Sequence, residues 1–114
     1  LDDIMLLKVG RHLRPDPRFK LILGREEGEN RYLEGYRRRF VALRPVSHRG
    51  PLCLVDGTPE ADDLTLAARV LARYSQGRDA DSVQVSIERP GGIGEVVEVA
   101  PLPPHELPAA WHIG

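Results

Sequence analysis

The sequence has few of the residues from which disulfide frameworks, metal sites and membrane spans are built. It contains one cysteine, Cys53, and four scattered histidines, so neither an internal disulfide nor a structural zinc site is expected. No apolar run approaches the ~20 residues that a membrane helix requires. The opening segment LDDIMLLK lacks the basic and apolar regions of a secretory signal. We therefore expect a cytoplasmic protein that does not associate with membranes.

Recognisable catalytic motifs are also missing. Cys53 lies in an apolar stretch, which predicts a buried, unreactive thiol, and no third group is evident that would orient a pair of Cys53 with His48. The glycines of residues 90–94 precede a predicted strand and lack a following Lys-Ser/Thr, so they indicate a turn rather than a phosphate loop. The carboxylates cluster at predicted helix starts, where the helix dipole accounts for them. We expect no catalytic site, metal or cofactor in this chain, whereas the activity of a larger parent protein is left open.

The size and composition indicate one globular domain spanning residues 1–114. A chain of 114 residues can bury one modest core, and its contents of 41% hydrophobic and 29% charged residues are those of a folded rather than a disordered chain. Because the sequence does not begin with methionine, we expect it to be a fragment of a longer protein.

The net charge of −1 conceals two halves of opposite sign. Residues 1–57 carry 12 Lys and Arg against 8 Asp and Glu, whereas residues 58–114 carry 4 against 9. A basic half is typical of proteins that bind polyanions such as nucleic acids, although many surface charges are simply solvated.

Alternating apolar residues predict about five or six strands. We expect extended chain over residues 5–14, and a hairpin over residues 8–24 that turns at Pro15 to Pro17. The other expected strands are Phe19–Leu23, Phe40–Val46, Pro51–Val55, Ser82–Ile87 and Glu95–Val99, of which the last two form a second hairpin. The proline-spaced tail leaves room for one helical turn near His105–Ala110, and Trp111 is expected to dock on the domain.

The sequence predicts one long and one short helix. The long helix spans Pro59–Gln76, with Thr58 as its N-cap, Pro59 at the first helical position and Gly77 just after its end. Its apolar stripe consists of Leu64, Ala67, Ala68, Leu71 and Tyr74. The short helix spans Glu26–Tyr36. The fold class is therefore α+β, with a mainly antiparallel sheet packed on the long helix.

The stretch Lys20–Asn30 (KLILGREEGEN) is the most informative part of the sequence, because an apolar strand there leads directly into a charged turn. Gly24 permits the turn, and the acidic residues that follow suit the first turn of a helix. Arg25 and Asn30 are its outward-reaching polar residues. We expect Glu29 to stabilise the helix start or to pair with an arginine, since a carboxylate repels phosphate.

A basic hairpin, a basic triplet and a basic loop all lie in the first half of the chain, and together they suit the recognition of an RNA backbone. We expect Asn30 either to cap a turn or to touch the ligand. The residues predicted to contact RNA phosphates are Arg11, Arg14, Lys20, Arg25, Arg37, Arg38, Arg39, Arg44 and Arg49.

Five segments of the chain resemble one family of RNA-binding domains. The segments are KVGRHLR, KLILGREEGEN, RGPLCLVDG, LAARVLARYSQGR and VQVSIERPGGIGEVVEV, and they resemble the NFACT-R domain. Within that family they are more similar to the C-terminal domains of 4-thiouridine synthase-like and tRNA methyltransferase-like proteins. The most specific parts are the pattern formed by Gly24, Arg25, Glu29 and Asn30, and the run from Ala67 to Ser75.

The resemblance implies a C-terminal domain that binds RNA, with tRNA as the ligand, attached in longer relatives to a PP-loop adenylating domain. The sequence has no SGGxDS nucleotide-binding motif, so any ATP-dependent activation belongs to that other domain. Two alternatives remain open. The domain either docks or dimerises its parent enzyme through an open sheet edge, or contributes Cys53 to a composite active site.

Overall fold

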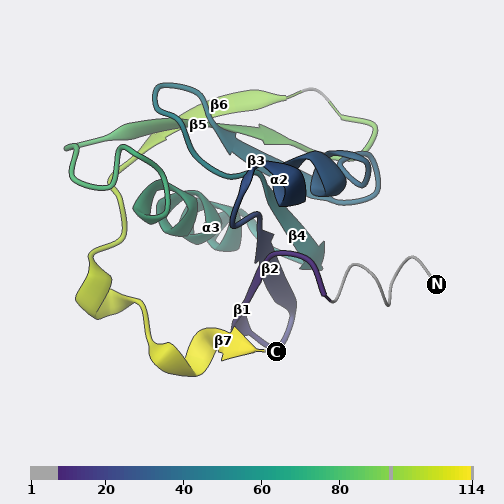
Figure 1. Cartoon of the computed structure of the whole chain (residues 1–114), viewed down its shortest axis with the longest axis horizontal. Helices are drawn as coiled ribbons and strands as arrows, with labels where there is room; N and C mark the ends of the chain where they lie inside the picture. The colour runs from purple at the N-terminus through teal and green to yellow at the C-terminus, as the bar shows by residue number, and fades with distance from the viewer. Residues whose placement is uncertain (1–7, 93, 114) are drawn as a thin grey trace.

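The computed structural model describes residues 8–92 and 94–113. Within these ranges, seven antiparallel strands form one sheet with the order β6-β5-β3-β4-β2-β1-β7 (Figure 1). The strands are β1 (Arg11–Asp16), β2 (Phe19–Leu23), β3 (Val41–Pro45), β4 (Cys53–Gly57), β5 (Val83–Glu88), β6 (Glu95–Val99) and β7 (His112–Ile113). The helices are α2 (Glu27–Glu34) and α3 (Ala61–Arg73), and two 3-10 turns, η1 (Pro104–Glu106) and η2 (Ala109–Trp111), lie in the C-terminal segment.

The main core lies between α3 and one face of the sheet. Directly opposed residues of paired strands share a face, and the register places Leu21, Val55 and Leu43 on the face that packs against α3. Leu64, Ala67, Ala68 and Leu71 of α3 are all buried there, and Tyr74 packs against the same core while remaining partly exposed. The predicted apolar stripe of the long helix is therefore confirmed.

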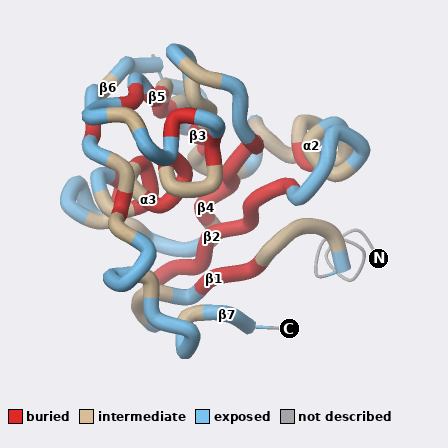
Figure 2. The backbone as a smooth tube through the Cα atoms, turned by 60° about the vertical axis from the view of Figure 1, so that its left-hand side comes forward, coloured by how far each residue is buried: buried red, intermediate tan, exposed pale blue. Residues whose placement is uncertain are grey.

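A smaller core lies on the opposite face, beneath α2. It contains Ile22, Ala42 and Leu54 from three paired strands and Leu33 from α2. β2 and β4 are buried along most of their length, as the red tube in Figure 2 shows. Each lies between two other strands and has one of the two cores on each of its faces. The α+β class and the packing of an antiparallel sheet on the long helix match the prediction.

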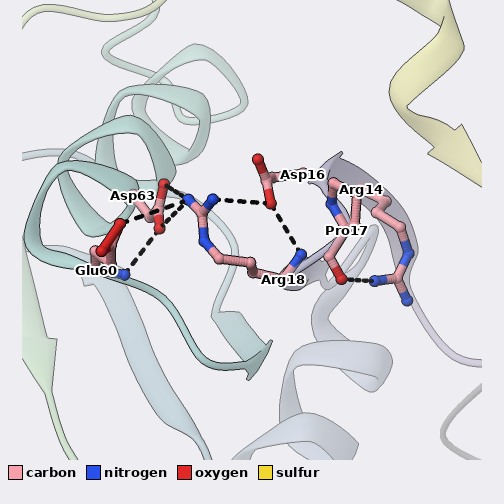
Figure 3. Close-up of polar contacts among 6 residues, drawn as sticks. All are labelled: Arg14, Asp16, Pro17, Arg18, Glu60 and Asp63. Carbon is pink, nitrogen blue, oxygen red and sulfur yellow. Dashed lines mark hydrogen bonds and ion pairs between the residues drawn. The ribbon is translucent and has the colours of Figure 1, made fainter.

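The N-terminal hairpin is joined to the start of α3 by a network of charges (Figure 3). The Arg18 guanidinium donates to both carboxylate oxygens of Asp63 at 2.9 and 2.8 Å, and it also pairs with Asp16 at 3.2 Å. Asp63 in turn accepts a hydrogen bond from the backbone N–H of Glu60 at 2.8 Å. This bond and the bonds from Arg18 lower the pKa of the Asp63 carboxyl. α3 therefore starts at Ala61 with Glu60 as its N-cap, rather than at Pro59 behind Thr58.

Several boundary predictions need correction. The N-terminal hairpin turns at Pro17 and Arg18 rather than at Pro15 to Pro17, because β1 continues to Asp16, and β4 spans Cys53–Gly57 rather than Pro51–Val55. β1 starts at Arg11, and Lys8 to Gly10 form a bend instead of continuing the strand, while residues 5–7 of that prediction lie outside the described residues. α2 ends at Glu34 instead of Tyr36, because Gly35 is followed by tight turns that lead into β3. α3 ends at Arg73, and residues 74–79 form successive turns.

The C-terminal segment supplies the strand that exceeds the predicted number. After β6 it follows the domain through η1 and η2, with Leu102 buried and Trp111 packed on the main core as predicted. β7 then pairs His112 and Ile113 with Leu13 and His12 of β1 (Figure 1). The proline spacing predicted room for one helical turn near His105–Ala110, whereas the segment forms the two short turns η1 and η2. The open edge of β1 then provides partners for a short strand.

Candidate nucleic-acid interface

Four segments that are distant in the sequence meet around one cleft of about 500 Å³, which we call the central cleft. They are the start of β1, the turn between β2 and α2, the loop before β4, and the chain just beyond α3. The residues that line the central cleft are Arg11, Leu23, Gly24, Arg25, Glu26, Glu27, Asn30, Arg49, Gly50, Pro51, Tyr74, Ser75, Gln76 and Arg78. Four of the five segments that carry the family resemblance therefore contribute to it.

Gly24 and Asn30 build the turn side of the central cleft. The Asn30 Oδ1 atom accepts the backbone N–H of Leu52 at 3.1 Å, and the N–H of Gly24 donates to the Leu52 carbonyl at 3.1 Å. A Cβ atom at position 24 would collide with Asn30 Oδ1. Glycine is required here because the Asn30 side chain occupies that space. Asn30 therefore has a structural role and also lines the cleft, and its contact with the ligand stays a prediction.

Glu29 is a structural residue, as predicted. Its carboxylate accepts hydrogen bonds from the Nε and Nη2 atoms of Arg25 at 2.9 and 2.6 Å. It also accepts hydrogen bonds from the backbone N–H groups of Arg25 and Gly10. The bonds from Arg25 are the main cause that lowers the pKa of Glu29 to about 2, and the two backbone bonds act in the same direction. Glu29 thereby fixes the start of β1, where Gly10 has a φ of 85°, against the turn after β2.

The opposite wall is formed where the loop before β4 contacts the end of α3. The backbone N–H of Gln76 donates to the Arg49 carbonyl at 2.7 Å. Gly50 lies so close to Ser75 that a Cβ atom at position 50 would approach the Ser75 Cβ to 2.7 Å. Ser75 is itself buried and accepts the N–H of Gly77 at 3.0 Å. This contact holds the backbones that carry Arg49 and Arg78 next to each other.

The central cleft brings together three arginines whose charge is not neutralised by a nearby carboxylate. Within residues 8–92 and 94–113, no Asp or Glu lies within ion-pair distance of Arg11, Arg49 or Arg78. The Arg11 guanidinium lies over the ring of Tyr74, 4.7 Å from its centroid. Arg25 also lines the cleft, but its charge is paired with Glu29.

Arg78 and Tyr74 were missed by the site prediction. Tyr74 belongs to the apolar stripe of α3, which favoured a core role, and Arg78 follows the helix in a turn. The only sequence signal was their place in the YSQGR end of a segment that carries the family resemblance. The contact between Gln76 and Arg49, which brings Arg78 to the cleft, depends on the tertiary structure.

Two further clefts adjoin the central cleft and share lining residues with it. One, of about 550 Å³, is lined by Arg11 and Arg25 together with Lys8, Gly10, His12, His112 and Ile113. The other, of about 520 Å³, is lined by Asn30, Arg49 and Gly50 together with Glu34, Arg44, Pro45, Val46, Ser47, His48 and Leu52. The three clefts share these residues and therefore adjoin one another, and together we call them the basic groove.

The arginine triplet lies outside the basic groove. Arg37 pairs with Glu34 at 3.3 Å, and the Arg39 guanidinium lies over the rings of Tyr36 and Phe40 at 5.5 and 5.7 Å. Arg37 and Arg38 line a separate cleft of about 380 Å³ with Arg89 and the turn between β5 and β6. The triplet therefore forms a second basic surface.

The remaining predicted RNA-contacting residues have local partners or are buried. Arg44 donates to both carboxylate oxygens of Glu34 at 3.1 and 2.9 Å, and Arg14 donates to the Pro17 carbonyl at 3.3 Å (Figure 3). Lys20 lies on the interior strand β2 opposite Asp56, and only 8% of its surface is exposed. Their contribution to RNA contact stays a prediction.

Cys53 is the one cysteine of the chain. Cys53 is fully buried, and burial raises the pKa of its thiol to about 12, which argues against a catalytic role. Among the residues that the structure describes, no group of three or more His, Cys, Asp or Glu side chains is arranged to hold a metal ion. No helix in the same ranges is both long and apolar enough to cross a membrane.

The comparisons with known proteins agree with this arrangement. Residues 10–112 match the model of the NFACT protein RNA binding domain, so the chain belongs to that family. The fold is similar to a solved structure of the C-terminal part of the fibronectin/fibrinogen-binding protein from Streptococcus suis, with a TM-score of 0.74 and 17% identity. That similarity covers 92% of this chain and 49% of the other, so the chain spans about half of the solved structure. No curated protein matched the sequence.

Proposed function

We propose that this domain binds RNA through the basic groove, with Arg11, Arg49 and Arg78 contacting phosphates. The observation that carries the proposal is the convergence of these three arginines, without carboxylate partners in the described ranges, in the central cleft of a domain from an RNA-binding family. A guanidinium can donate two hydrogen bonds to one phosphate, and such contacts depend little on base sequence. Binding of this kind requires no cofactor, so any chemistry belongs to another part of the parent protein.

The experiment that tests the proposal is a titration of an RNA transcript over a series of salt concentrations. Arg49→Gln and Arg78→Gln are each expected to make the slope of log K against log salt shallower by about 0.7 to 0.9, because each removes one phosphate contact. Arg31→Gln is the matched control, since Arg31 is 80% exposed, lies on α2 and does not line the central cleft. Equal slopes for all three variants would contradict the proposal.

A narrower form of the proposal makes tRNA the ligand and a cytoplasmic tRNA-modifying enzyme the parent protein. It rests on the resemblance of the segments around Gly24 to Asn30 and Ala67 to Ser75 to the C-terminal domains of 4-thiouridine synthase-like proteins. In such a protein a PP-loop adenylating domain supplies the chemistry, and this domain holds the substrate. Sequencing the RNA that copurifies with the chain from cells tests this form, because enrichment of tRNA over other abundant RNAs is expected.

A second candidate function is association with protein, including a second copy of the same chain. It is favoured by β6, which is an edge strand on which Val96 is 59% exposed. The solved structure with the similar fold also belongs to a protein named for binding fibronectin and fibrinogen. Sedimentation with and without RNA separates the two functions, since a dimerisation module associates without RNA and an RNA-binding module remains a monomer until RNA is added.

A further inference from the structure

One wall of the central cleft carries a planar cation supported by an aromatic ring. Arg11 and Tyr74 both line the cleft, and both side chains are partly exposed. The guanidinium carbon of Arg11 lies 4.7 Å from the centroid of the Tyr74 ring, which places the cation over the ring. Guanidinium planes and aromatic rings are the two surfaces on which proteins stack unpaired nucleobases. The pair therefore has the chemistry of a stacking platform for a base.

The charges around this platform favour one position for a phosphate. Glu26 and Glu27 are the acidic residues that line the central cleft, and they follow Arg25 directly in the chain. The wall that carries Arg49 and Arg78 contributes no acidic residue to the lining. A phosphate is therefore favoured at Arg49 and Arg78, which line the same cleft as Arg11 and Tyr74.

Two neighbouring clefts share basic residues with the central cleft. Arg11 is shared with the cleft that contains Lys8 and His12, and Arg49 is shared with the cleft that contains His48. A set of adjoining basic clefts with a stacking platform suits a single strand, whose bases can turn toward the protein. In a duplex the bases are stacked on one another, and a platform within a cleft cannot reach them without unpairing.

We propose that the basic groove binds RNA as an unpaired strand, with one base stacked on the Arg11–Tyr74 pair and the adjoining phosphate held by Arg49 and Arg78. This inference rests on the proposed RNA-binding function and adds the class of RNA that is bound. It assigns Arg11 a role in contacting a base rather than a phosphate alone.

The test compares three RNAs with the whole chain: a single-stranded hexamer, the same hexamer with one abasic nucleotide, and a duplex of at least 16 base pairs. The intact hexamer is expected to bind more tightly per available site than the duplex. An abasic nucleotide at the platform is expected to weaken binding by about 5- to 150-fold, because stacking of one base contributes an effect of this order. Placing the abasic nucleotide at each position in turn identifies the one that occupies the platform.

Arg11→Lys provides the matching protein variant, because lysine keeps the positive charge but lacks the planar guanidinium. The variant is expected to weaken binding of the intact hexamer and to leave binding of the abasic hexamer unchanged. If Arg11 only connects β1 to the end of α3, the variant weakens the binding of both RNAs by the same factor, and the inference is overturned. Circular dichroism of the variant verifies its fold, and the abasic series tests the inference on the wild-type chain alone.

The outcomes also separate this inference from the proposed function. If neither single-stranded nor duplex RNA binds at low salt, the proposed function fails. If both bind equally per available site and the abasic nucleotide has no effect, RNA binding stands and the single-strand inference fails.

Discussion

Asn30 and Leu52 are joined by a hydrogen bond of 3.1 Å from the Leu52 backbone N–H to the Asn30 side-chain oxygen, and this bond connects the turn after β2 to the residue before β4. The same side chain occupies the space left open by Gly24. The most specific part of the family pattern is thus mainly a structural device. It shapes one wall of the central cleft and presents Arg25 at its rim.

Gly24→Ala is expected to destabilise the domain by about 2 kcal/mol. The new methyl group displaces Asn30 and leaves the Leu52 N–H without its acceptor, and an unsatisfied buried donor costs about 1 to 3 kcal/mol. Chemical denaturation measures the change. Gly28→Ala is the control, because a Cβ at position 28 meets only the Glu26 carboxylate at 3.5 Å, and alanine favours a helix by about 1 kcal/mol over glycine.

A double-mutant cycle tests the mechanism behind that loss. If Gly24→Ala acts by displacing Asn30, its cost must shrink in the Asn30→Ala background, where the side chain that it collides with is absent. An unchanged cost would assign the effect to the backbone of the turn.

The Glu29 carboxylate is expected to make the folding stability of the domain decrease as the pH falls in the acidic range. Its pKa is about 2 in the folded chain, against an ordinary value of 4.5, so its contribution is complete above about pH 5 and is lost as the pH falls toward 2. A shift of this size corresponds to about 3 kcal/mol, but the partner Arg25 is half exposed, and solvent screening reduces the expected contribution to about 1 kcal/mol.

The measurement is the free energy of unfolding of the wild type and of Glu29→Gln between pH 2 and pH 6. The difference between the two proteins is expected to be largest near pH 6 and to decrease below pH 4.5. A difference that stays constant over this range would show that the charge of Glu29 is not what stabilises the turn.

Reversing the charges of the arginine triplet is expected to weaken RNA binding less than reversing the charges of Arg49 and Arg78. The triplet lies on the second basic surface, Arg37 is paired with Glu34, and Arg39 packs on Tyr36 and Phe40. Replacing Arg37 to Arg39 with glutamate tests whether this surface takes part at all. Binding that is unchanged across a salt series would remove the triplet from the RNA interface and leave the basic groove as the proposed site.

Cys53 is expected to resist alkylation in the folded protein. Its side chain is fully buried and burial raises the pKa of the thiol to about 12, so very little reactive thiolate is exposed at neutral pH. Labelling with iodoacetamide at pH 8 should become fast only when denaturant unfolds the chain. Rapid labelling without denaturant would reopen the hypothesis of a chemical role for this residue.

Local periodicity in the sequence was sufficient to predict the strands and the helix whose residues alternate or repeat regularly. The period-two alternation of Val83, Val85 and Ile87 indicated β5, and the apolar stripe of α3 indicated the face that packs on the sheet. The start of α3 was misplaced because Asp63 accepts the N–H of Glu60 and is bound by Arg18, which lies 45 residues earlier. β7 was missed because its two residues depend on the edge of β1 for their pairing.

The site was predicted only as a distribution of charge. The basic first half includes Arg11 and Arg49, which line the central cleft, but the prediction gave the same weight to Arg44, whose charge is paired with Glu34. Which cations have carboxylate partners depends on tertiary distances that composition does not contain. Arg78 lies in the acidic half of the chain, so the charge count directed attention away from it.

The three arginines of the central cleft come from residues 11, 49 and 78, and contacts between distant segments hold them together. No contiguous peptide of this chain reproduces that arrangement, so the unfolded chain lacks the site. RNA that occupies the groove then binds the folded state preferentially and stabilises it, by about 2.7 kcal/mol when the free RNA concentration is 100 times the dissociation constant. The melting temperature of the domain thus becomes a measure of groove occupancy.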